Sequence, residues 1–376
     1  MSLYLDYNAS APILPEVLDV MNDTYKNRPG NADSRTHIYG TNAGKLVQDC
    51  RSKIATILHV DPAEIIFTAG STESNNTAIL GIEDYARETG KMHIITTAIE
   101  HKAVLEPLKY LENKGFSVDY VRPDESGRIS ADTLLSLVRD DTVLVSVMFV
   151  NSETGIIQPV EKIGKVLKEK KILFHVDATQ ALGKLNDRIR KLDYNMMSIA
   201  AHKIGGPQGI GALILRRDDQ YKRPPITPLM YGGHQERGFR PGTTPVALVA
   251  GFAKAMEYAD QNLSRNMEGC QRIKDAFFTA IKDLPYSLNG DPNYCLPSTV
   301  NISIDGLDAE AAFLCLGDRY SFSNGSACNS SSHSLSYVLE AMGLSEKRKS
   351  EAIRLSWSGT EEIDFSEFVS IVKSMI

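Results

Sequence analysis

The residue best suited to chemistry in this sequence is a single cysteine in a run of small polar residues. The run at 323–332 places Cys328 among Ser, Asn, Gly and Ala residues, with no bulky neighbour to bury it. Such a segment cannot pack as a helix or strand without a large loss of backbone entropy, so it predicts a mobile loop that presents a reactive thiol. The alternative is an incidental thiol in a surface linker.

A lysine and an aspartate each follow an apolar run that is typical of a buried strand. Asp177 ends the run at 174–177, and Lys203 precedes a segment with four glycines at 205–211. The amine of such a lysine can form a Schiff base when desolvation or nearby cations lower its pKa, and the glycines let the backbone approach a bulky ligand closely. The Asp177 carboxylate requires solvent or a cationic partner at the end of an apolar strand.

Small hydroxyl residues at 68–76 form a third candidate feature, an anion site. They follow an apolar run and open a helical pattern, so free backbone N–H groups and the helix dipole would face an anion. Pyridoxal 5'-phosphate needs an amine for its aldehyde, a carboxylate for its pyridine nitrogen and an anion site for its phosphate. The combination predicts this cofactor. Taken singly, Ser71 or Thr72 could be an ordinary N-cap, and Asp177 or Lys203 could be structural.

The elements that must position these residues alternate along the chain. Short apolar runs rich in Val, Ile and Phe predict buried strands, and the longer segments between them carry the helical spacing of apolar residues. This alternation predicts an α/β fold with a mainly parallel sheet, because helices of that length can cross back over the sheet. We expect strands at 65–67, 93–95, 143–150, 172–176 and 213–215, and helices at 43–58, 72–89, 102–114, 131–139 and 160–169.

The pattern of the sequence changes after residue 245. Two long helical patterns, at 246–262 and 266–282, precede a strand-like run at 298–304. This order predicts a second, smaller α+β domain. We expect a large domain over 13–260 and a small domain formed by 1–12 and 261–376, with Cys328 in the small domain.

Composition and charge argue against several classes of protein. The 376 residues are 42% hydrophobic and 23% charged, as in ordinary globular proteins, and the formal net charge of -6 argues against a broad nucleic-acid surface. No basic segment followed by an apolar run opens the sequence, and no window approaches ~18 apolar residues. We therefore expect a cytoplasmic protein with no membrane span and no direct nucleic-acid binding.

The five cysteines indicate a reducing compartment. Their odd number and the lack of CxxC spacing suit neither a disulfide framework nor a zinc site, so no metal is expected. Cys50 and Cys315 lie in helical or apolar runs, where buried thiols behave as small hydrophobic groups. His37 and His234 are expected to have structural or interface roles, because no Asp, Glu or His partner lies at metal-ligand spacing. His175, on the strand that leads to Asp177, is expected to be a core histidine with its hydrogen bonds satisfied.

Nearly the whole chain resembles the cysteine desulfurases of the NifS and IscS kind, which are fold-type I pyridoxal phosphate enzymes. The resemblance implies that L-cysteine is converted to L-alanine and that its sulfur is left as a persulfide on Cys328. The sequence around Cys328 resembles that of the long-loop group, whose members transfer sulfur to an acceptor protein. The resembling segments lie at 5–9, 30–37, 67–76, 100–104, 150–155, 175–185, 202–215, 240–243 and 325–328.

Carried over position by position, the resemblance implies a role for each site residue. Lys203 would form the Schiff base, and Asp177 would hold the pyridine nitrogen. Thr243 would reach the phosphate from the second subunit of a homodimer. His101 would stack on the cofactor ring and take part in proton transfer, and Gln180 would contact the phenolic oxygen. Thr72 and His202 would hold the phosphate. Asn151 and Arg354 would bind the substrate carboxylate, and Asn151 would also lie beside the cofactor. The apolar neighbours of Arg354 predict a strand that enters the core rather than a surface salt bridge.

The sequence departs from the family pattern in several places. Ala200 replaces a serine that usually contacts the phosphate. The sequence at 357–360 differs from the one that usually follows Arg354, and the sequence at 332–334 differs from the one that usually follows Cys328. Members that load iron–sulfur scaffolds also resemble one another in a longer tail than this one, which ends at Ile376. These departures lead to the hypothesis of a dedicated pathway such as nucleic-acid sulfur modification, for example DNA phosphorothioation, with iron–sulfur assembly as the alternative.

Other functions are compatible with the same cofactor residues. An aminotransferase, a selenocysteine lyase or an epimerase would use the same lysine, aspartate and phosphate site but would need no mobile thiol. A degenerate relative could serve as a non-catalytic scaffold and would then bind no cofactor. Replacement of Cys328 separates these hypotheses, because only desulfuration requires that thiol.

Overall fold

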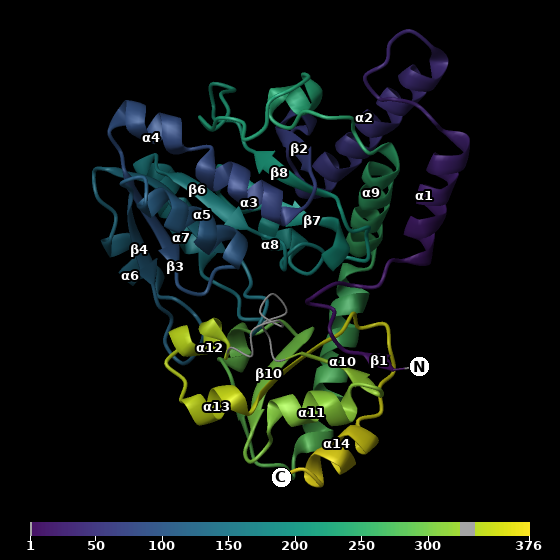
Figure 1. Cartoon of the computed structure of the whole chain (residues 1–376), viewed down its shortest axis with the longest axis vertical. Helices are drawn as coiled ribbons and strands as arrows, with labels where there is room; N and C mark the ends of the chain where they lie inside the picture. The colour runs from purple at the N-terminus through teal and green to yellow at the C-terminus, as the bar shows by residue number, and fades with distance from the viewer. Residues whose placement is uncertain (1, 324–334) are drawn as a thin grey trace.

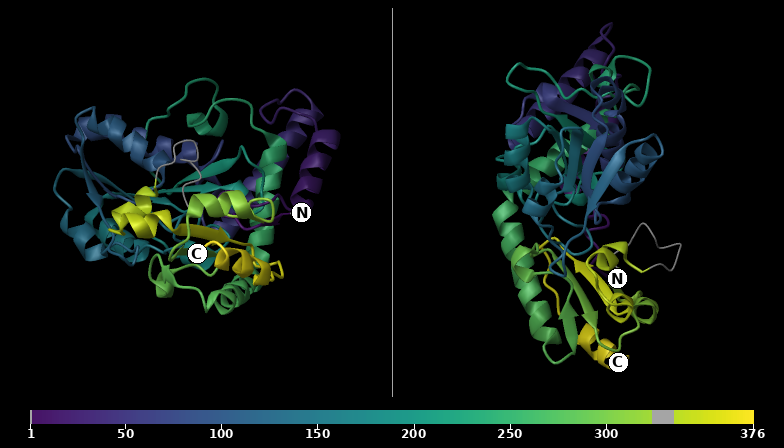
Figure 2. Two further views of the ribbon diagram at one scale, coloured as in Figure 1. Left: turned by 60° about the horizontal axis from the view of Figure 1, so that its bottom comes forward. Right: turned by 90° about the vertical axis from the view of Figure 1, so that its left-hand side faces the viewer.

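The computed structural model describes residues 2–323 and 335–376 (Figure 1). Cys328 and the loop predicted for it lie outside the described residues. The upper part of the molecule is built on a large sheet, and the lower part is built on two small sheets (Figures 1 and 2). Two consecutive long helices, α9 (Val246–Gln261) and α10 (Leu263–Ile281), connect the upper part to the lower part.

The described strands of the large sheet lie in the order β2-β8-β7-β6-β5-β3-β4. Strand β8 pairs antiparallel with both of its neighbours, and the other neighbouring strands run parallel. The predicted α/β fold with a mainly parallel sheet is therefore confirmed. The strands are Ile65–Thr68 (β2), His93–Thr97 (β3), Ser117–Val121 (β4), Thr142–Met148 (β5), Leu173–Asp177 (β6), Met196–Ala200 (β7) and Gly211–Leu215 (β8).

Helices cover both faces of the sheet because its strands are apolar on both sides. Ile65 and Phe67 of β2 pack in one core with α2, α7 and α9, whereas Ile66 between them packs in a second core with α3, α4 and α5. The helices of this part, besides α9, are Pro15–Asn27 (α1), Ile38–Leu58 (α2), Ser71–Leu80 (α3), Glu83–Thr89 (α4), Lys102–Glu112 (α5), Ala131–Ser136 (α6), Val160–Lys170 (α7) and Asn186–Ile189 (α8).

The helix predicted at 72–89 is two helices. Gly81 caps α3, and its carbonyl oxygen accepts a hydrogen bond from the Thr227 N–H at 2.8 Å. A Cβ at this position would lie 2.4 Å from the Thr77 carbonyl oxygen, so the close approach requires glycine. The helix is therefore interrupted at residues 81–82, between α3 and α4.

The lower part has a core of its own. Strands β12, β10 and β9 form an antiparallel sheet in that order, and β1 pairs parallel with β11. Phe277, Trp357 and Phe368 pack at the centre of this core together with Leu5. The division at residue 260 stays a prediction. The elements besides α10 are Leu3–Tyr4 (β1), Tyr286–Leu288 (β9), Thr299–Ile304 (β10), Tyr320–Ser321 (β11), Ala352–Ser356 (β12), Ala309–Leu316 (α11), Tyr337–Ala341 (α12), Glu346–Ser350 (α13) and Ser366–Lys373 (α14).

The structure corrects one prediction about the cysteines. Cys50 is buried as expected, but Cys315 is exposed. Helix α11 buries Ala309, Ala312 and Leu316 on one face, so Cys315 falls on the outer face. Not every residue of an apolar run is therefore buried when the run forms a helix.

Structural roles predicted for two histidines are confirmed. His175 is fully buried, and its ring nitrogens lie 2.9 Å from the hydroxyl oxygens of Ser146 and Ser198. His37 accepts a hydrogen bond from the Gly40 N–H and caps α2.

Residues 2–323 and 335–376 contain neither a cluster of metal-ligating side chains nor a membrane-spanning helix. Within these ranges, no group of three His, Cys, Asp or Glu side chains is placed to hold a metal ion. In the same part of the chain, no helix is both long enough and apolar enough to cross a bilayer.

Candidate active site

A cavity of about 270 Å³ lies at the C-terminal edge of the parallel strands. Ligand sites of open α/β sheets occur at this edge, because the loops after successive strands meet there. The cavity brings together most of the predicted site residues, namely Thr72, His101, Asp177, Gln180, His202, Lys203 and Arg354. Asn151 and Thr243 do not line it.

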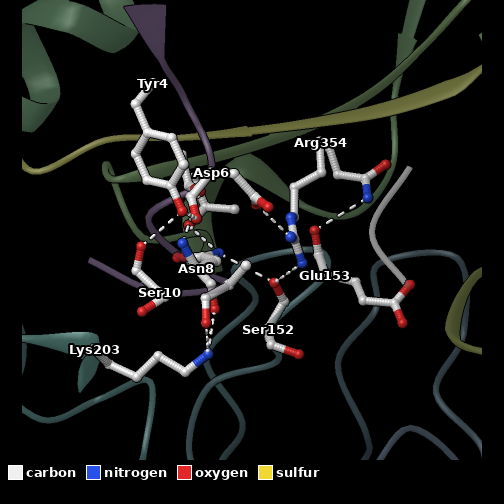
Figure 3. Close-up of polar contacts among 12 residues, drawn as sticks. Tyr4, Asp6, Asn8, Ser10, Ser152, Glu153, Lys203 and Arg354 are labelled. Atoms are coloured by element: carbon white, nitrogen blue, oxygen red, sulfur yellow. Dashed lines mark hydrogen bonds and ion pairs between the residues drawn. The ribbon is translucent and has the colours of Figure 1, made fainter. Parts of the chain in front are cut away.

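Lys203 lies at the end of a short 3-10 turn (Ala201–Lys203) that follows β7. Its Nζ donates hydrogen bonds to the main-chain oxygens of Asn8 at 2.6 Å and Ala9 at 2.7 Å (Figure 3). Both oxygens belong to the N-terminal segment between β1 and α1. This segment, which the sequence did not identify as part of the site, therefore directs the amine into the cavity.

Asp177 is a buried carboxylate with a donor on each oxygen. Asn75 Nδ2 donates to its Oδ2 at 2.8 Å, and the Thr179 N–H donates to its Oδ1 at 3.0 Å. Each carboxylate oxygen can accept a further hydrogen bond. Thr179 Oγ1 is also buried at the cavity and has no hydrogen-bond partner among the described residues. Polar groups are thus available here for a ligand.

The N-terminus of α3 opens into a hollow that adjoins the cavity. Gly70 is the N-cap and no side chain caps the helix, so the alternative reading of Ser71 or Thr72 as an ordinary N-cap is not confirmed. The hollow is lined by Ser10, Thr72, His202 and Gln208, among others. Ser10 Oγ lies 3.3 Å from both His202 Nδ1 and Gln208 Nε2, which places a hydroxyl group at this hollow. Free N–H groups of a helix terminus favour an anion.

His202 is neutral at this hollow near pH 7. Burial, and next the positive charge of Lys203, lower the pKa of His202 to about 4. A neutral imidazole can donate one hydrogen bond to an anion without adding a charge.

His101 caps α5 with its side chain. The Ala103 N–H donates to His101 Nδ1 at 3.0 Å. Because Nδ1 accepts, the proton of a neutral ring lies on Nε2. The ring of His101 therefore presents a proton-bearing nitrogen on its other side.

Arg354 comes from β12 of the small sheet and reaches across to the N-terminal segment. Its side chain is 2% exposed, its Nη2 lies 2.5 Å from Asp6 Oδ1, and its Nη1 donates to the Ser152 carbonyl oxygen at 3.1 Å (Figure 3). The strand predicted for Arg354 is confirmed. The sequence did not identify Asp6 as its partner.

Asn151 lies beside the cavity with its side chain engaged in a turn. Its Oδ1 accepts from the N–H groups of Glu153 and Thr154, and its Nδ2 donates to the Ile99 carbonyl oxygen at 3.0 Å. These bonds shape the loop that carries Ser152 and Glu153 into the cavity wall. The contacts predicted for Asn151 with the cofactor and the substrate stay a prediction.

Gln180 lies between two lysines. Its Nε2 donates to the Asn8 carbonyl oxygen at 2.8 Å, the same oxygen that Lys203 contacts, and its Oε1 accepts from Lys184 Nζ at 3.0 Å. Burial is the main cause that lowers the pKa of Lys184 to about 8. Lys184, which the sequence reasoning did not single out, thus orients the Gln180 amide with its NH₂ group toward the N-terminal segment.

Two buried glutamates border the site. Glu100 Oε1 accepts from Thr97 Oγ1 and from the Met148 N–H, and burial raises the pKa of Glu100 to about 8. Glu153 Oε2 accepts from Ser336 Oγ at 2.5 Å, and burial raises its pKa as well. Ser336 caps α12, so Glu153 joins the large-sheet loops to the start of that helix.

Comparisons with known proteins identify the family. The family model described as Aminotransferase class-V matches residues 3–356. The cysteine desulfurase IscS of Vibrio vulnificus (strain YJ016) is 40% identical over 372 residues, which cover 97% of this chain and 91% of that protein. The chain belongs to the cysteine desulfurases. This family depends on pyridoxal 5'-phosphate, so the predicted activity and cofactor are confirmed.

Solved structures support the assignment of this chain to the cysteine desulfurases. A NifS-like protein superposes with a TM-score of 0.90 at 35% identity and covers 100% of this chain and 98% of its own. DndA from Streptomyces lividans superposes with a TM-score of 0.82 at 40% identity, over 95% and 99% of the two chains. The predicted fold-type I architecture is confirmed by these neighbours.

The residues of the cavity fit the cofactor. The Lys203 amine, the Asp177 carboxylate with accepting capacity, and an α3 N-terminus without a side-chain cap supply the groups that the aldehyde, pyridine nitrogen and phosphate need. Gly70 and Gly211 approach closely beneath this terminus, where a Cβ on Gly211 would lie 2.8 Å from the Gly70 Cα. The desulfurase thus has glycine at both positions beside the hollow at the N-terminus of α3.

Proposed function

We propose that this desulfurase converts L-cysteine to L-alanine in the cavity around Lys203 and leaves the sulfur as a persulfide on Cys328. One arrangement carries the proposal. The Lys203 amine and the Arg354 guanidinium reach the same N-terminal segment, at Asn8 and Asp6, from the large and the small sheet respectively. An amine and a carboxylate-binding cation therefore lie on either side of one space.

Substrate binding is assigned to Arg354. Its buried planar guanidinium suits a bidentate contact with the carboxylate of an amino acid. Cofactor binding is assigned to Lys203, Asp177, Gln180, His101, Thr72 and His202, with Asn151 in support. When bound, the cofactor supplies an aldehyde for Lys203 and an electron sink that acidifies the substrate α-carbon.

Proton transfer is assigned to Lys203 and His101. The Lys203 amine takes the α-proton of the substrate, and His101 donates the proton on its Nε2 to the substrate sulfur or to the cofactor ring. The Cys328 thiolate then attacks the substrate sulfur, so that one carbon–sulfur bond breaks and one sulfur–sulfur bond forms. L-cysteine and the enzyme thiol thereby give L-alanine and the enzyme persulfide, with no external oxidant.

We also propose a homodimer in which Thr243 completes the phosphate site of the neighbouring subunit. Thr243 is exposed, and neither the cavity nor its adjoining hollow includes it in the same chain. Large apolar side chains are exposed nearby in the segment before it, including Leu229, Met230 and Tyr231. Such side chains favour burial against a partner.

The sulfur acceptor is proposed to be a protein of a dedicated pathway, such as nucleic-acid sulfur modification, in the cytoplasm. The identities to IscS and to DndA are both 40%, so they favour neither pathway. Support comes from the altered sequence at 332–334 next to Cys328, where a partner would dock. The four cysteines in the described ranges are free thiols, which agrees with a reducing compartment.

Labelled L-cysteine tests the proposal. The purified holoenzyme is incubated with cysteine labelled at sulfur, and we expect label on the peptide that contains Cys328 together with an equal amount of L-alanine. Label on another cysteine, or alanine without bound sulfur, would contradict the assignment. A pull-down that recovers mainly an iron–sulfur scaffold would contradict only the dedicated pathway.

A further inference from the structure

A buried ion pair, Arg51–Glu236, lies away from the cavity and has no role in the chemistry proposed above. Arg51 Nη2 and Nη1 donate to Glu236 Oε1 at 2.6 Å and Oε2 at 2.9 Å, and the two side chains are 3% and 5% exposed. Arg51 on α2 also donates to the Ile65 carbonyl oxygen at 2.7 Å, and Glu236 accepts from the Phe67 N–H at 2.8 Å. The pair therefore fastens the segment between β8 and α9 to strand β2.

The pair holds an unusual turn in place. Glu236 and Arg237 have φ angles of 47° and 59°, and Gly238 follows at 84°. Left-handed backbone is strained in a residue other than glycine and persists only when the surroundings impose it. A buried ion pair adds little net stability, but it can specify one conformation. Here the imposed conformation is the reversal of the chain at 236–238.

This turn leads directly to Thr243. Gln235 Oε1 accepts from the Gly242 N–H at 3.1 Å, and Arg240 Nε lies 3.2 Å from Glu73 Oε1 at the start of α3. Thr244 is 8% exposed, whereas Thr243 beside it is exposed. The segment lies beside β2 and α2 at the top of the molecule in Figure 1. Thr243 is thus an exposed residue that follows a turn anchored by hydrogen bonds and ion pairs.

We infer that Arg51 and Glu236 are positioning residues for the cofactor site of the neighbouring subunit. By fixing the turn at 236–238, the pair presents Thr243 at the place where the partner's phosphate site can use it. This inference rests on the proposed homodimer and on the proposed contact of Thr243. It assigns to two residues that line neither the cavity nor its adjoining hollow an effect on cofactor affinity in the other chain.

Two variants separate positioning from folding. Glu236→Gln removes the charge-assisted bonds, and the double variant Arg51→Met with Glu236→Leu replaces the pair by apolar groups, which buried sites often tolerate. We expect both homodimers to lose cofactor affinity about tenfold or more, as for a lost charge-assisted hydrogen bond. Both should stay folded dimers, and the double variant should melt at a lower temperature because the Ile65 carbonyl oxygen and the Phe67 N–H lose their side-chain partners. Arg190→Met, which breaks the half-buried pair with Asp260 in the same part of the chain, is the matched control and should retain the cofactor.

Hybrid dimers test the effect across the interface. One chain carries Lys203→Ala and cannot hold the cofactor covalently, so the absorbance near ~420 nm reports only the chain with Lys203 intact. We expect Glu236→Gln on the Lys203→Ala chain to weaken cofactor binding in the intact chain. The same substitution on the intact chain should leave its own site at wild-type affinity.

The Thr243→Ala substitution, placed in the same hybrids, distinguishes the possible failures. The proposed contact across the interface is wrong if no dimer forms, or if Thr243→Ala leaves cofactor affinity in the Lys203-containing chain unchanged whichever chain carries it. The inference about Arg51 and Glu236 is then wrong as well. If Thr243→Ala acts across the interface but the double variant binds cofactor normally, the contact stands and the positioning role of Arg51 and Glu236 is wrong. Loss confined to the chain that carries Glu236→Gln also overturns the inference.

Discussion

Arg354 Nη2 and Asp6 Oδ1 lie 2.5 Å apart, although 348 positions separate the two residues in the sequence. The ion pair joins β12 of the small sheet to the segment that also contacts Lys203 through Asn8 and Ala9. Together with the Ser152 carbonyl oxygen, Asp6 fixes the plane of the guanidinium before a substrate arrives. The cation is therefore oriented in advance, which reduces the entropy cost of binding.

Arg354→Lys tests the role of this oriented cation. Lysine keeps the charge but lacks the planar fork, so we expect KM for L-cysteine to rise about tenfold to a hundredfold, with a smaller change in kcat. Steady-state kinetics measure both constants. Arg319→Lys, in the exposed pair with Glu367, is the control and should leave both unchanged. An unchanged KM in the Arg354 variant would exclude a substrate contact.

Cys328→Ser tests the sulfur-accepting thiol against a natural control in the same chain. We expect the variant to lose persulfide formation and sulfide release while it keeps the absorbance of the Lys203-bound cofactor, because the thiol acts only after substrate binding. Cys315→Ser removes a thiol that is exposed on α11 and should retain full activity. Desulfuration at the wild-type rate in the Cys328 variant would show that Cys328 is not the nucleophile.

Asp177→Asn tests the carboxylate at the end of β6. An amide of the same shape cannot stabilise a protonated pyridine nitrogen, so we expect kcat to fall roughly a hundredfold or more, as when a preorganised electrostatic contact is removed. The melting temperature of the apoenzyme should be measured beside kcat, because the amide keeps only one accepting oxygen for the two donors, Asn75 Nδ2 and the Thr179 N–H. Asn75→Ala removes the donor at 2.8 Å and should give a smaller loss of the same kind. Activity near the wild-type level in Asp177→Asn would contradict the assignment.

Glu100 should make the stability of the apoenzyme depend on pH. Burial, followed by the charge of Asp177, raises the pKa of Glu100 from its ordinary value of 4.5 to about 8, against hydrogen bonds from Thr97 and Met148 that lower it. Between these two values the folded protein binds more protons than the unfolded chain, so the free energy of unfolding falls as pH rises from about 4.5 to about 8.

Denaturant unfolding at several pH values checks this expectation. Glu100→Gln is neutral at every pH, so we expect it to gain stability relative to the wild type as pH rises toward 8 and to differ little near pH 4.5. Glu125→Gln, at a side chain that is 77% exposed, should follow the wild-type curve. Parallel curves for the wild type and Glu100→Gln would show that the pKa of Glu100 is the same in the folded and the unfolded protein, which would contradict the prediction.

The sequence was sufficient to predict the central elements. The strands β2, β3, β5, β6 and β8 are buried over all or nearly all of their length, so their apolar runs identify them. The edge strand β4 alternates polar with apolar residues and is half-exposed, and it was not predicted. Cys315 was predicted wrongly because an apolar run does not say which face of α11 is covered.

The candidate site was predictable where a residue and its chemistry lie in one short motif. Lys203, Asp177 and the start of α3 are of this kind, since each follows a strand of the sheet. Asp6 and Asn8 were not found, because their partners lie 348 and 195 positions away and no local pattern marks a carbonyl oxygen that will meet an amine. Such contacts depend on how the N-terminal segment crosses between the sheets.

That crossing sets an order of events during synthesis. Strand β1 pairs with Tyr320 and Ser321, and Asp6 bridges to Ser356, so the segment at 3–6 waits for partners that are synthesised much later. The large sheet can close while translation continues, but the segment that holds the Lys203 amine settles only when β11 and β12 exist. A nascent or truncated chain that stops before residue 320 should therefore carry its lysine and aspartate without an assembled catalytic centre.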